Sequence, residues 1–447
     1  MNLNAVILAG GIGKRITPLG INKPKAMFKI LGKPFIQHIL ESIRDSGMVE
    51  NVIIVVGPGD SQIREFLEKN PIENLNLIFT VQEKPLGQAN ALETARDFLR
   101  GEFLVLNAND VFDSILITEL AEKGINEGLD VALVGREVDE PSKFGVMAFD
   151  EHGRLTGVVE KPKPELVPSH TAVIGLYFFS EKFWEALDST PRTQTDNQLE
   201  RAYSKLIAAG TGGYKSYNGT FESYKVPWDL LKINEKLLER VTSTKIAETA
   251  KVSPLAVLDG NVIVEEGVRI FEYAVIRGPA YIGKNSIIGN HTLIRGGTSI
   301  GESCVVGFGT EISNSILGDH CWTHKNFLGD SIISDNCSFG AGTITANLRF
   351  DEAPVKVRVG EQRISSGMEH FGVIMAEDCR TGCNAVLSPG VKIGPNSIIG
   401  PSVVLMDDLA SGKMALLEKD AYSIKDSHID VHKLSRGERM ESLKGTS

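Results

Sequence analysis

The sequence predicts an α/β domain followed by an all-β domain of stacked coils. Short apolar runs alternate with amphipathic segments over the first half of the 447-residue chain. An apolar residue then recurs at every sixth position from Val252 to Ile312. Glycine is also uneven, since 21 of the 45 glycines lie within residues 252–410. Two halves with different periods indicate two domains, each expected to bury its own core.

The composition is that of an ordinary folded protein, with 42% hydrophobic and 23% charged residues. A net charge of −10 argues against nucleic acid as the main partner, because phosphate backbones select clustered lysine and arginine. No apolar run approaches the ~20 residues of a membrane span, and the N-terminus does not resemble a secretory signal. Five cysteines without a CxxC pair favour free thiols in a reducing cytosol. We therefore expect a cytoplasmic protein without a membrane partner.

Apolar runs and amphipathic segments place the elements of the first half. Five runs are expected to form strands: Ala5–Ala9, Val52–Val56, Leu77–Val81, Phe103–Leu106 and Val131–Val134. Three segments between them are expected to form helices: Pro34–Ser46, Ser61–Lys69 and Gln88–Leu99. This alternation predicts a mostly parallel sheet covered by helices. Ligands of such sheets bind beyond the C-terminal ends of the strands, so the loops there are the candidate site.

The first of these loops, residues 8–15, is rich in glycine and ends in two cations. Glycines allow backbone N–H groups to approach a phosphate, and the basic side chains Lys14 and Arg15 neutralise it. A GGxG pattern alone fits a phosphate loop and a plain turn about equally well. It is neither a P-loop nor the dinucleotide pattern GxGxxG. Downstream, Lys25 follows a proline and is a pre-positioned cation or a solvated charge.

The string LAGGIGKRITPL, followed by KPKAMFKILGKP, resembles the signature of sugar-1-phosphate nucleotidylyltransferases. The resemblance extends over the first ~235 residues and implies a Rossmann-like mixed sheet within residues 1–229. It also implies attack of a sugar-1-phosphate oxygen on the α-phosphorus of a nucleoside triphosphate, UTP or dTTP, with release of pyrophosphate. Catalysis of that reaction is positioning and charge neutralisation.

By this resemblance, Arg15 and Lys25 are catalytic, and Asp110 holds Mg²⁺ at a strand end. The implied nucleotide-binding residues are Leu8, Gly10, Gly11, Gln82 and Gly87. The implied sugar-phosphate-binding residues are Gly145, Glu160 and Lys161.

Two positions depart from the family pattern. The family has a second acidic or amide metal ligand before a PWDLL-like segment, and that position here is Ser223. Glu222 or Asp229 could compensate. A sugar-contacting asparagine is replaced by Val173. The sequence therefore leaves open whether nucleotidyl transfer is retuned, weak or absent.

The second half is a six-residue repeat, which predicts coils of three short strands. Its apolar positions are Val252, Leu258, Val264, Ile270, Ile276, Ile282, Ile288, Ile294, Ile300, Val306 and Ile312. The pattern slips near Leu317 and resumes at Thr381. Hexapeptide repeats of this kind resemble those of left-handed parallel β-helices, which implies such a helix over residues 251–416 and a homotrimer. Residues 230–250 are expected to be a helical connector, and residues 417–447 a poorly ordered tail or packing arm.

The interruption at residues 317–380 resembles the acetyltransferase domain of the bifunctional enzymes that make UDP-N-acetylglucosamine, in their archaeal form. The resemblance implies His324 as general base, Asn347 as a ligand of the amino sugar, Lys356 as a ligand of its phosphate, and acetyl-CoA as co-substrate. Histidine suits this role because the attacking amine must lose a proton near neutral pH. A lone loop histidine is otherwise a solvated or structural residue.

Three departures weaken the match: Phe327 replaces a tyrosine, Ser338 an asparagine, and a lysine is missing near Ala353. The leading hypothesis is a bifunctional enzyme of amino-sugar nucleotide synthesis. One alternative is a regulatory or scaffolding relative that binds nucleotide sugars without turnover. Another is a nucleotidyltransferase whose β-helix only oligomerises.

Overall fold

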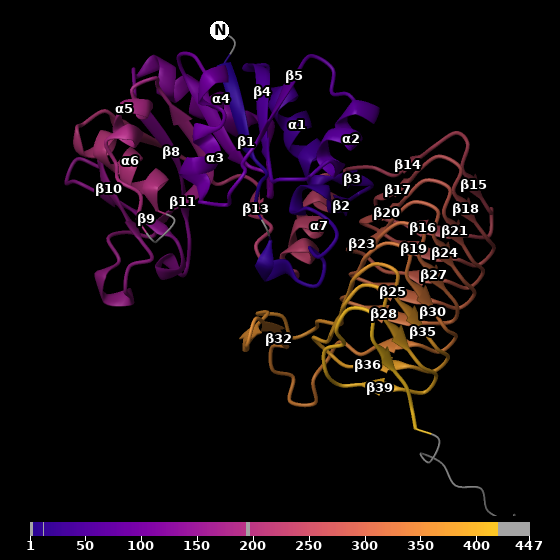
Figure 1. Cartoon of the computed structure of the whole chain (residues 1–447). Coiled ribbons are helices and arrows are strands. Elements are labelled where there is room, and N and C mark those ends of the chain that lie inside the picture. Colours follow the sequence, from indigo (N-terminus) through magenta and orange to yellow (C-terminus); the bar gives the residue numbers. More distant parts are fainter. Residues whose placement is uncertain (1–2, 12, 194–196, 419–447) are drawn as a thin grey trace, which may run out of the picture.

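The computed structural model describes residues 3–11, 13–193 and 197–418, and Figure 1 shows two joined units. The first carries helices around a sheet, and the second is a stack of short strands. No helix in these ranges is long and apolar enough to cross a membrane. The tail expected over residues 417–447 lies, apart from its first two residues, outside the described part.

The first unit is a mixed nine-stranded sheet covered by helices, which confirms the predicted fold class. Its strands run in the order β10-β9-β11-β6-β1-β4-β5, and β8 and β12 extend it beside β11. The strands are β1 (Leu3–Leu8), β4 (Val49–Val56), β5 (Asn76–Val81), β6 (Phe103–Asn107), β8 (Val131–Glu137), β9 (Gly145–Phe149), β10 (Leu155–Glu160), β11 (Thr171–Phe179) and β12 (Gly212–Ser216). Strands β6, β1, β4 and β5 are parallel, so the loops after β1 and β6 leave the same edge.

Helices pack on this sheet through apolar faces. They are α1 (Phe35–Ser46), α2 (Gln62–Lys69), α3 (Gln88–Glu93), α4 (Ser114–Asn126), α5 (Phe183–Asp188), α6 (Gln198–Ala208) and α7 (Asp229–Glu239). The helix expected over Gln88–Leu99 is shorter, because α3 ends at Glu93 and a 3₁₀ turn, η3 (Arg96–Phe98), follows. Two small antiparallel pairs stand apart: β2 (Lys29–Ile30) with β3 (Lys33–Pro34), and β7 (Asp110–Phe112) with β13 (Phe221–Ser223).

The second unit is a left-handed β-helix whose three faces are parallel sheets. Sheet D contains β14 (Lys245–Ile246), β17 (Val262–Val264), β20 (Ala280–Ile282), β23 (Thr298–Ile300), β26 (Ile316–Leu317), β29 (Ile332–Ile333), β34 (Ile374–Met375) and β37 (Lys392–Ile393). Sheet E contains β15 (Lys251–Val252), β18 (Arg269–Ile270), β21 (Ile287–Ile288), β24 (Val305–Val306), β27 (Trp322–Thr323), β30 (Ser338–Phe339), β35 (Arg380–Thr381), β38 (Ile398–Ile399) and β40 (Met414–Ala415). Sheet F contains β16 (Val257–Asp259), β19 (Val275–Arg277), β22 (Leu293–Ile294), β25 (Glu311–Ser313), β28 (Phe327–Gly329), β31 (Ile344–Thr345), β36 (Val386–Leu387) and β39 (Val404–Leu405).

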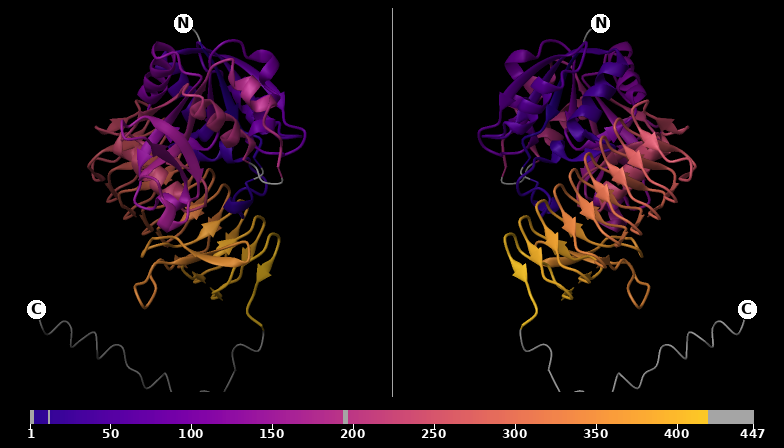
Figure 2. Two further views of the ribbon diagram at one scale, coloured as in Figure 1. Left: turned by 90° about the vertical axis from the view of Figure 1, so that its left-hand side faces the viewer. Right: turned by 90° about the vertical axis from the view of Figure 1, so that its right-hand side faces the viewer.

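The six-residue apolar stripe fills the interior of these coils. From Val264 to Ile312 each of its residues is at most 2% exposed, and Val252 and Leu258 are partly buried at the first coil. In the two side views the coils stack along one oblique axis (Figure 2). Among the expected connector residues, α7 ends at Glu239 and β14 at Lys245 already pairs with β17.

The slip near Leu317 has a simple cause in the register. Paired residues are 18 apart in early coils, such as Ile282 and Ile300, but 17 apart for Ile300 and Leu317. Two corners have therefore each lost one residue by the time Ile312 pairs with Leu328. The coils continue unbroken to Thr345, so the true insertion is shorter than the expected interruption. It carries a hairpin of β32 (Lys356–Val359) and β33 (Gln362–Ser365).

The two cores are not fully separate, which corrects the expectation of self-contained halves. One buried cluster contains Phe28 and Tyr224 of the first unit together with Ile332 and Phe371 of the β-helix. The Tyr281 ring on sheet D lies so close to the Gly32 turn that an added Cβ there would stand 2.2 Å from the tyrosine hydroxyl. Sheet D is therefore the face on which the first unit packs.

Candidate active sites

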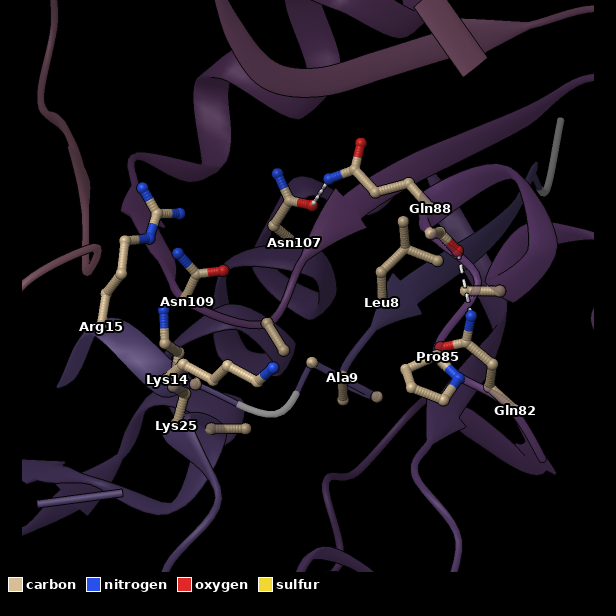
Figure 3. A pocket seen from close by; sticks show the side chains of 17 residues that line it. Leu8, Ala9, Lys14, Arg15, Lys25, Gln82, Pro85, Gln88, Asn107 and Asn109 are labelled. Atoms are coloured by element: carbon tan, nitrogen blue, oxygen red, sulfur yellow. Dashed lines mark hydrogen bonds between the residues drawn. The ribbon is translucent and has the colours of Figure 1, made fainter. Parts of the chain in front are cut away.

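A pocket of about 430 Å³ opens at the edge of the sheet where β1 and β6 end. It is lined by Leu8, Ala9, Gly10, Gly11, Gly13, Lys14, Arg15, Lys25, Ala26, Gln82, Pro85, Gly87, Gln88, Ala91, Asn107, Ala108 and Asn109. All residues expected to be catalytic in the first unit or to bind nucleotide lie in this lining. Figure 3 shows the cations on one side and the Gln82 segment on the other.

The glycine loop leaves room for a ligand and holds a bent backbone. An added Cβ would meet no atom within 4 Å at Gly11, whereas at Gly10 it would stand 2.8 Å from Gln82 Oε1. Gly13 has a φ of +67°, a conformation that side chains disfavour. The described glycines of this loop line the pocket beside η1 (Lys14–Ile16), which supplies two cations.

Lys25 lies in the short turn η2 (Lys25–Met27), and its position is set by Tyr224. Its Nζ donates to the Tyr224 carbonyl at 3.2 Å and lies 5.6 Å from the centre of that ring. Burial and the neighbouring Arg15 charge lower the pKa of Lys25, and Asp110 opposes them. A cation held this way is poised to meet an anionic ligand.

Gln82 is buried, and its two amide hydrogens are occupied. Nε2 donates to the Gly87 carbonyl at 3.0 Å and to Asn90 Oδ1 at 3.1 Å. These bonds fix the side-chain plane and leave Oε1 next to Gly10 as an acceptor (Figure 3). A carbonyl oxygen of this kind can accept a hydrogen bond from a ring N–H group.

Asp110 starts β7 and faces Ser223 across the pair with β13. Asn107 Nδ2 donates to Asp110 Oδ2 at 3.2 Å, and Ser223 also hydrogen-bonds this carboxyl. Burial raises the pKa of Asp110 to about 6, although both hydrogen bonds lower it. Gly175 is required here, because an added Cβ would stand 2.6 Å from Asp110 Oδ2.

The two carboxylates that could replace a second acidic ligand are engaged elsewhere. Glu222 precedes Ser223 in β13, so its side chain lies on the opposite face of the strand, where it pairs with Lys232 at 3.0 Å. Asp229 Oδ2 accepts backbone N–H groups of Lys225 and Val226. Among the described residues no cluster of three or more His, Cys, Asp or Glu side chains could hold a metal. The described part of the chain therefore offers one carboxylate, Asp110, at this position.

The expected sugar segment lies on β9 and β10, outside the pocket lining. Glu160 pairs with Gly145, and a Cβ on that glycine would stand 2.9 Å from Glu160 Oε2. Lys161 is exposed, and its N–H donates to the Phe144 carbonyl at 2.9 Å. Lys225 Nζ lies 5.1 Å from the centre of the Phe144 ring, so it joins this segment to the strand that carries Ser223.

Sequence reasoning missed Asn107 and the Tyr224 carbonyl. Asn107 ends β6, lines the pocket and donates a hydrogen bond to Asp110. The sequence signal that could have identified it is a polar residue at the end of a buried strand. The Tyr224 carbonyl holds Lys25 through the backbone. No sequence pattern marks such a contact.

In the β-helix, His324 and Asn347 lie at opposite ends of β28. His324 is exposed at the corner between sheets E and F, where its backbone N–H donates to Asn326 Oδ1. Asp330, at the other end, is 8% exposed and accepts Asn347 Nδ2 at 2.6 Å and Asn314 Nδ2 at 2.8 Å. Asp330 thus orients Asn347. A single chain does not bring these two expected residues together, and Lys356 is exposed on the hairpin.

A nucleotide pocket on a mixed sheet, joined to a hexapeptide β-helix, defines a two-domain transferase. The nucleotidyl transferase family matches residues 4–224, and the bacterial transferase hexapeptide family matches residues 261–296 and 372–406.

Several relatives match nearly the whole chain, and three of them represent the group. The bifunctional protein GlmU of Methanococcus maripaludis is 40% identical over 91% of this chain and 95% of its own. The protein of the same name from Methanocaldococcus jannaschii is 35% identical over 92% and 96%. A bifunctional sugar-1-phosphate nucleotidylyltransferase/acetyltransferase of Sulfurisphaera tokodaii is 30% identical over 92% and 99%. The chain belongs to this family of bifunctional nucleotidyltransferase–acetyltransferases.

Proposed function

We propose that the first unit transfers the nucleotidyl group of UTP or dTTP to a sugar-1-phosphate, and that the β-helix acetylates an amino-sugar phosphate with acetyl-CoA. The observation that carries the proposal is the single pocket that gathers the glycine loop, Arg15, Lys25 and Gln82. The names of the relatives support both reactions. Nucleoside triphosphates and acetyl-CoA are cytosolic, and the five cysteines are free thiols, as suits the cytoplasm.

In nucleotidyl transfer, an oxygen of the sugar-1-phosphate attacks the α-phosphorus and pyrophosphate leaves. The loop amides and Arg15 bind the triphosphate, and Lys25 neutralises charge as it moves to the leaving group. No covalent intermediate on the protein is needed. The chain's contribution is alignment of two anions that would otherwise repel each other.

The base is selected by Gln82. Its Oε1 is the free acceptor, and both uracil and thymine present a ring N–H. Cytosine has no hydrogen on the corresponding nitrogen. This supports a choice of UTP or dTTP over CTP.

The residues around Asp110 fit a magnesium ion that arrives with the nucleotide. Mg²⁺ in such sites takes one or two carboxylates and completes its shell with phosphate oxygens and water, and the chain supplies one buried carboxylate. The ion, when bound, neutralises phosphate charge. Ser223 and Asn107 then orient the Asp110 carboxylate by hydrogen bonding.

Sugar binding is proposed for Gly145, Glu160 and Lys161. They lie on the β9–β10 pair, and Lys225 links that pair to the Asp110 side of the site. Glu160 offers an acceptor for sugar hydroxyls, and Lys161 a cation for the phosphate. The side chain of Val173 cannot form a hydrogen bond, so this chain recognises the sugar through fewer polar contacts than the family pattern provides.

In acetyl transfer, the amine nitrogen attacks the thioester carbon, His324 accepts the amine proton and the thiol of CoA leaves. Asn347, held by Asp330, orients the amino sugar, and Lys356 meets its phosphate. Because His324 and Asn347 lie at opposite ends of β28, we propose that a neighbouring copy completes the site.

A homotrimer is supported by the outer face of sheet F. The outward side chains of its strands are mostly apolar and partly exposed: Val257, Val275, Leu293, Phe327, Ile344, Val386 and Val404. Sheet D is covered by the first unit, whereas this apolar strip has no cover within the described chain. Contiguous exposed apolar strips mark interfaces between proteins.

The test is a substrate panel. The purified chain is incubated with Mg²⁺, each of UTP, dTTP and CTP, and several sugar-1-phosphates, and pyrophosphate release is measured. A second panel measures CoA release from acetyl-CoA with amino-sugar phosphates. We expect release with UTP or dTTP and with at least one amino sugar. Tight nucleotide binding without any turnover would instead establish the scaffolding alternative.

A further inference from the structure

Four successive coils of the β-helix present an acidic residue at the same corner, beginning with Glu302, and the last three of these residues contact the first unit. Asp319 follows β26, Asp335 follows β29 and Glu377 follows β34, each two residues beyond its strand. We call these three residues the acidic column. The column borders sheet D, the face on which the first unit packs.

The acidic column holds the segment of the first unit that carries Lys25. The contacts are an ion pair of Lys23 with Asp335, an ion pair of Lys29 Nζ with Asp319 Oδ2 at 2.5 Å, and a hydrogen bond from Asn22 Nδ2 to Glu377 Oε1 at 2.6 Å. Lys25 lies between the two paired lysines. In the side views this indigo segment lies against the orange coils (Figure 2).

The two ion pairs of the acidic column are partly buried. The paired side chains are 20% and 31% exposed for Lys23 and Asp335, and 34% and 14% for Lys29 and Asp319. Burial lowers the pKa of Lys29, but the hydrogen bond and charge of Asp319 outweigh it and the net pKa is raised. Partly buried pairs are screened less by salt than exposed ones. Phe28, between the two pairs, is packed in the shared core.

The lysines of this segment fall into two groups according to the charges that surround them. Lys23 and Lys29 are neutralised by the β-helix, so they do not compete for the triphosphate. Lys25 instead donates to the neutral Tyr224 carbonyl and lines the pocket. Because a small misplacement of a catalytic group costs rate, anchoring both flanks of Lys25 matters to the reaction.

We infer that Asp319 and Asp335 of the β-helix are positioning residues for nucleotidyl transfer in the first unit. The two halves are thereby coupled: the β-helix is part of the framework of the nucleotide site. The inference rests on the proposed nucleotidyl transfer.

The experiment compares full-length D335N and D319N/D335N with the wild type. Glu266→Gln is the matched control, since Glu266 occupies the same corner in an earlier coil and pairs with Lys284. Pyrophosphate release is measured with UTP, Mg²⁺ and the best sugar-1-phosphate. We expect kcat of the double variant to fall about 10- to 100-fold, with the KM for sugar phosphate changed less than about twofold. The control variant should keep the wild-type kcat.

A charge swap separates positioning from loss of folding. D335K should lose activity, and K23D/D335K should recover to within about threefold of the wild type, since it restores the pair with reversed sign. Unchanged kcat in D319N/D335N, or no recovery in the swap despite a wild-type melting temperature, would overturn the inference. A wild-type chain that releases no pyrophosphate would instead refute the proposed function.

Discussion

At the residue scale, Gln82 is the residue proposed to read the base, and two internal hydrogen bonds fix its side chain. Since Gly87 and Asn90 accept its amide hydrogens, Oε1 is the atom that we propose accepts a hydrogen bond from the base. Gln82→Ala should raise the KM for UTP about tenfold or more, the scale of one lost hydrogen bond to a buried partner, and should reduce discrimination against CTP. Steady-state kinetics with both nucleotides measure this.

The matched control for that variant is Gln198→Ala. Gln198 donates to the Thr190 carbonyl, far along the chain from the pocket lining. Equal selectivity between UTP and CTP in wild type and Gln82→Ala would show that another group reads the base.

Asp110 carries a cost in folding stability whose size depends on pH. Its folded pKa of about 6 lies above the ordinary 3.8, so the folded state binds this proton more tightly than the unfolded chain. Ionised Asp110 therefore destabilises the fold above about pH 6, and the cost vanishes below pH 4, where both states are protonated. Asp110→Asn should raise the melting temperature by a few degrees at pH 8 without metal and leave it unchanged at pH 4.

The same variant should lose pyrophosphate release, because a neutral amide lacks the negative charge with which this single carboxylate would hold Mg²⁺. An Asp110→Asn protein that melts lower than the wild type at pH 8 would show that the carboxylate is structural and not a strained ligand. The melting measurement requires a buffer that contains a chelator, because a bound cation favours the ionised form of Asp110.

Ser223 tests the departure from the family pattern. It lies opposite Asp110, so Ser223→Asp places a second carboxylate beside the first. We expect the variant to need less Mg²⁺ for half-maximal activity, by several-fold, because two carboxylates bind the ion more tightly than one. Magnesium titrations of initial rate measure it. A higher Mg²⁺ requirement than in the wild type would refute this account of Ser223.

How far the sequence predicts the site is also clear at this scale. Most residues that form the pocket lie in strings after three strands, β1, β5 and β6, and a parallel sheet brings such loops together. Asn107 was missed because it looks like a strand residue. The Tyr224 carbonyl was missed because the contact between it and Lys25 spans 199 positions. A contact between residues so far apart in the sequence follows from tertiary packing and leaves no local pattern in the sequence.

At the element scale, the β-helix was predictable because one apolar residue in six must face its interior. The loss of single residues at two corners was not predictable, since it leaves every strand in place and only shortens turns. The helix expected over Gln88–Leu99 ended early. Its last turn tightened into η3, although the apolar pattern continued.

The apolar strip of sheet F gives the prediction for this scale. Ile344 is 41% exposed at its centre, and a charge there would be buried at an interface. Ile344→Glu should convert the proposed trimer to monomer at micromolar concentration, as measured by light scattering. Met414→Glu is the control, since Met414 is exposed on sheet E. A monomeric mass for the wild-type protein would contradict the proposed trimer.

At the scale of the whole molecule, the shared core and the acidic column make one framework of two units. Contacts between them could not be predicted, because the lysines of residues 23–29 look like a solvated run and the acidic column looks like ordinary turns. Only the fold places them together. His324 lies at the corner between sheets E and F, away from sheet D, so we expect a change at His324 to leave the contacts of the acidic column in place.

The central claim is that one chain carries two distinct transfer sites, and a pair of variants tests it most directly. Pyrophosphate and CoA release are measured for wild type, Lys25→Ala and His324→Ala, with melting temperature and mass as controls. We predict that Lys25→Ala loses pyrophosphate release but keeps CoA release, and that His324→Ala loses CoA release by about 10²–10⁴-fold but keeps pyrophosphate release. Unchanged CoA release in His324→Ala, or equal loss of both activities in both folded variants, would contradict the claim.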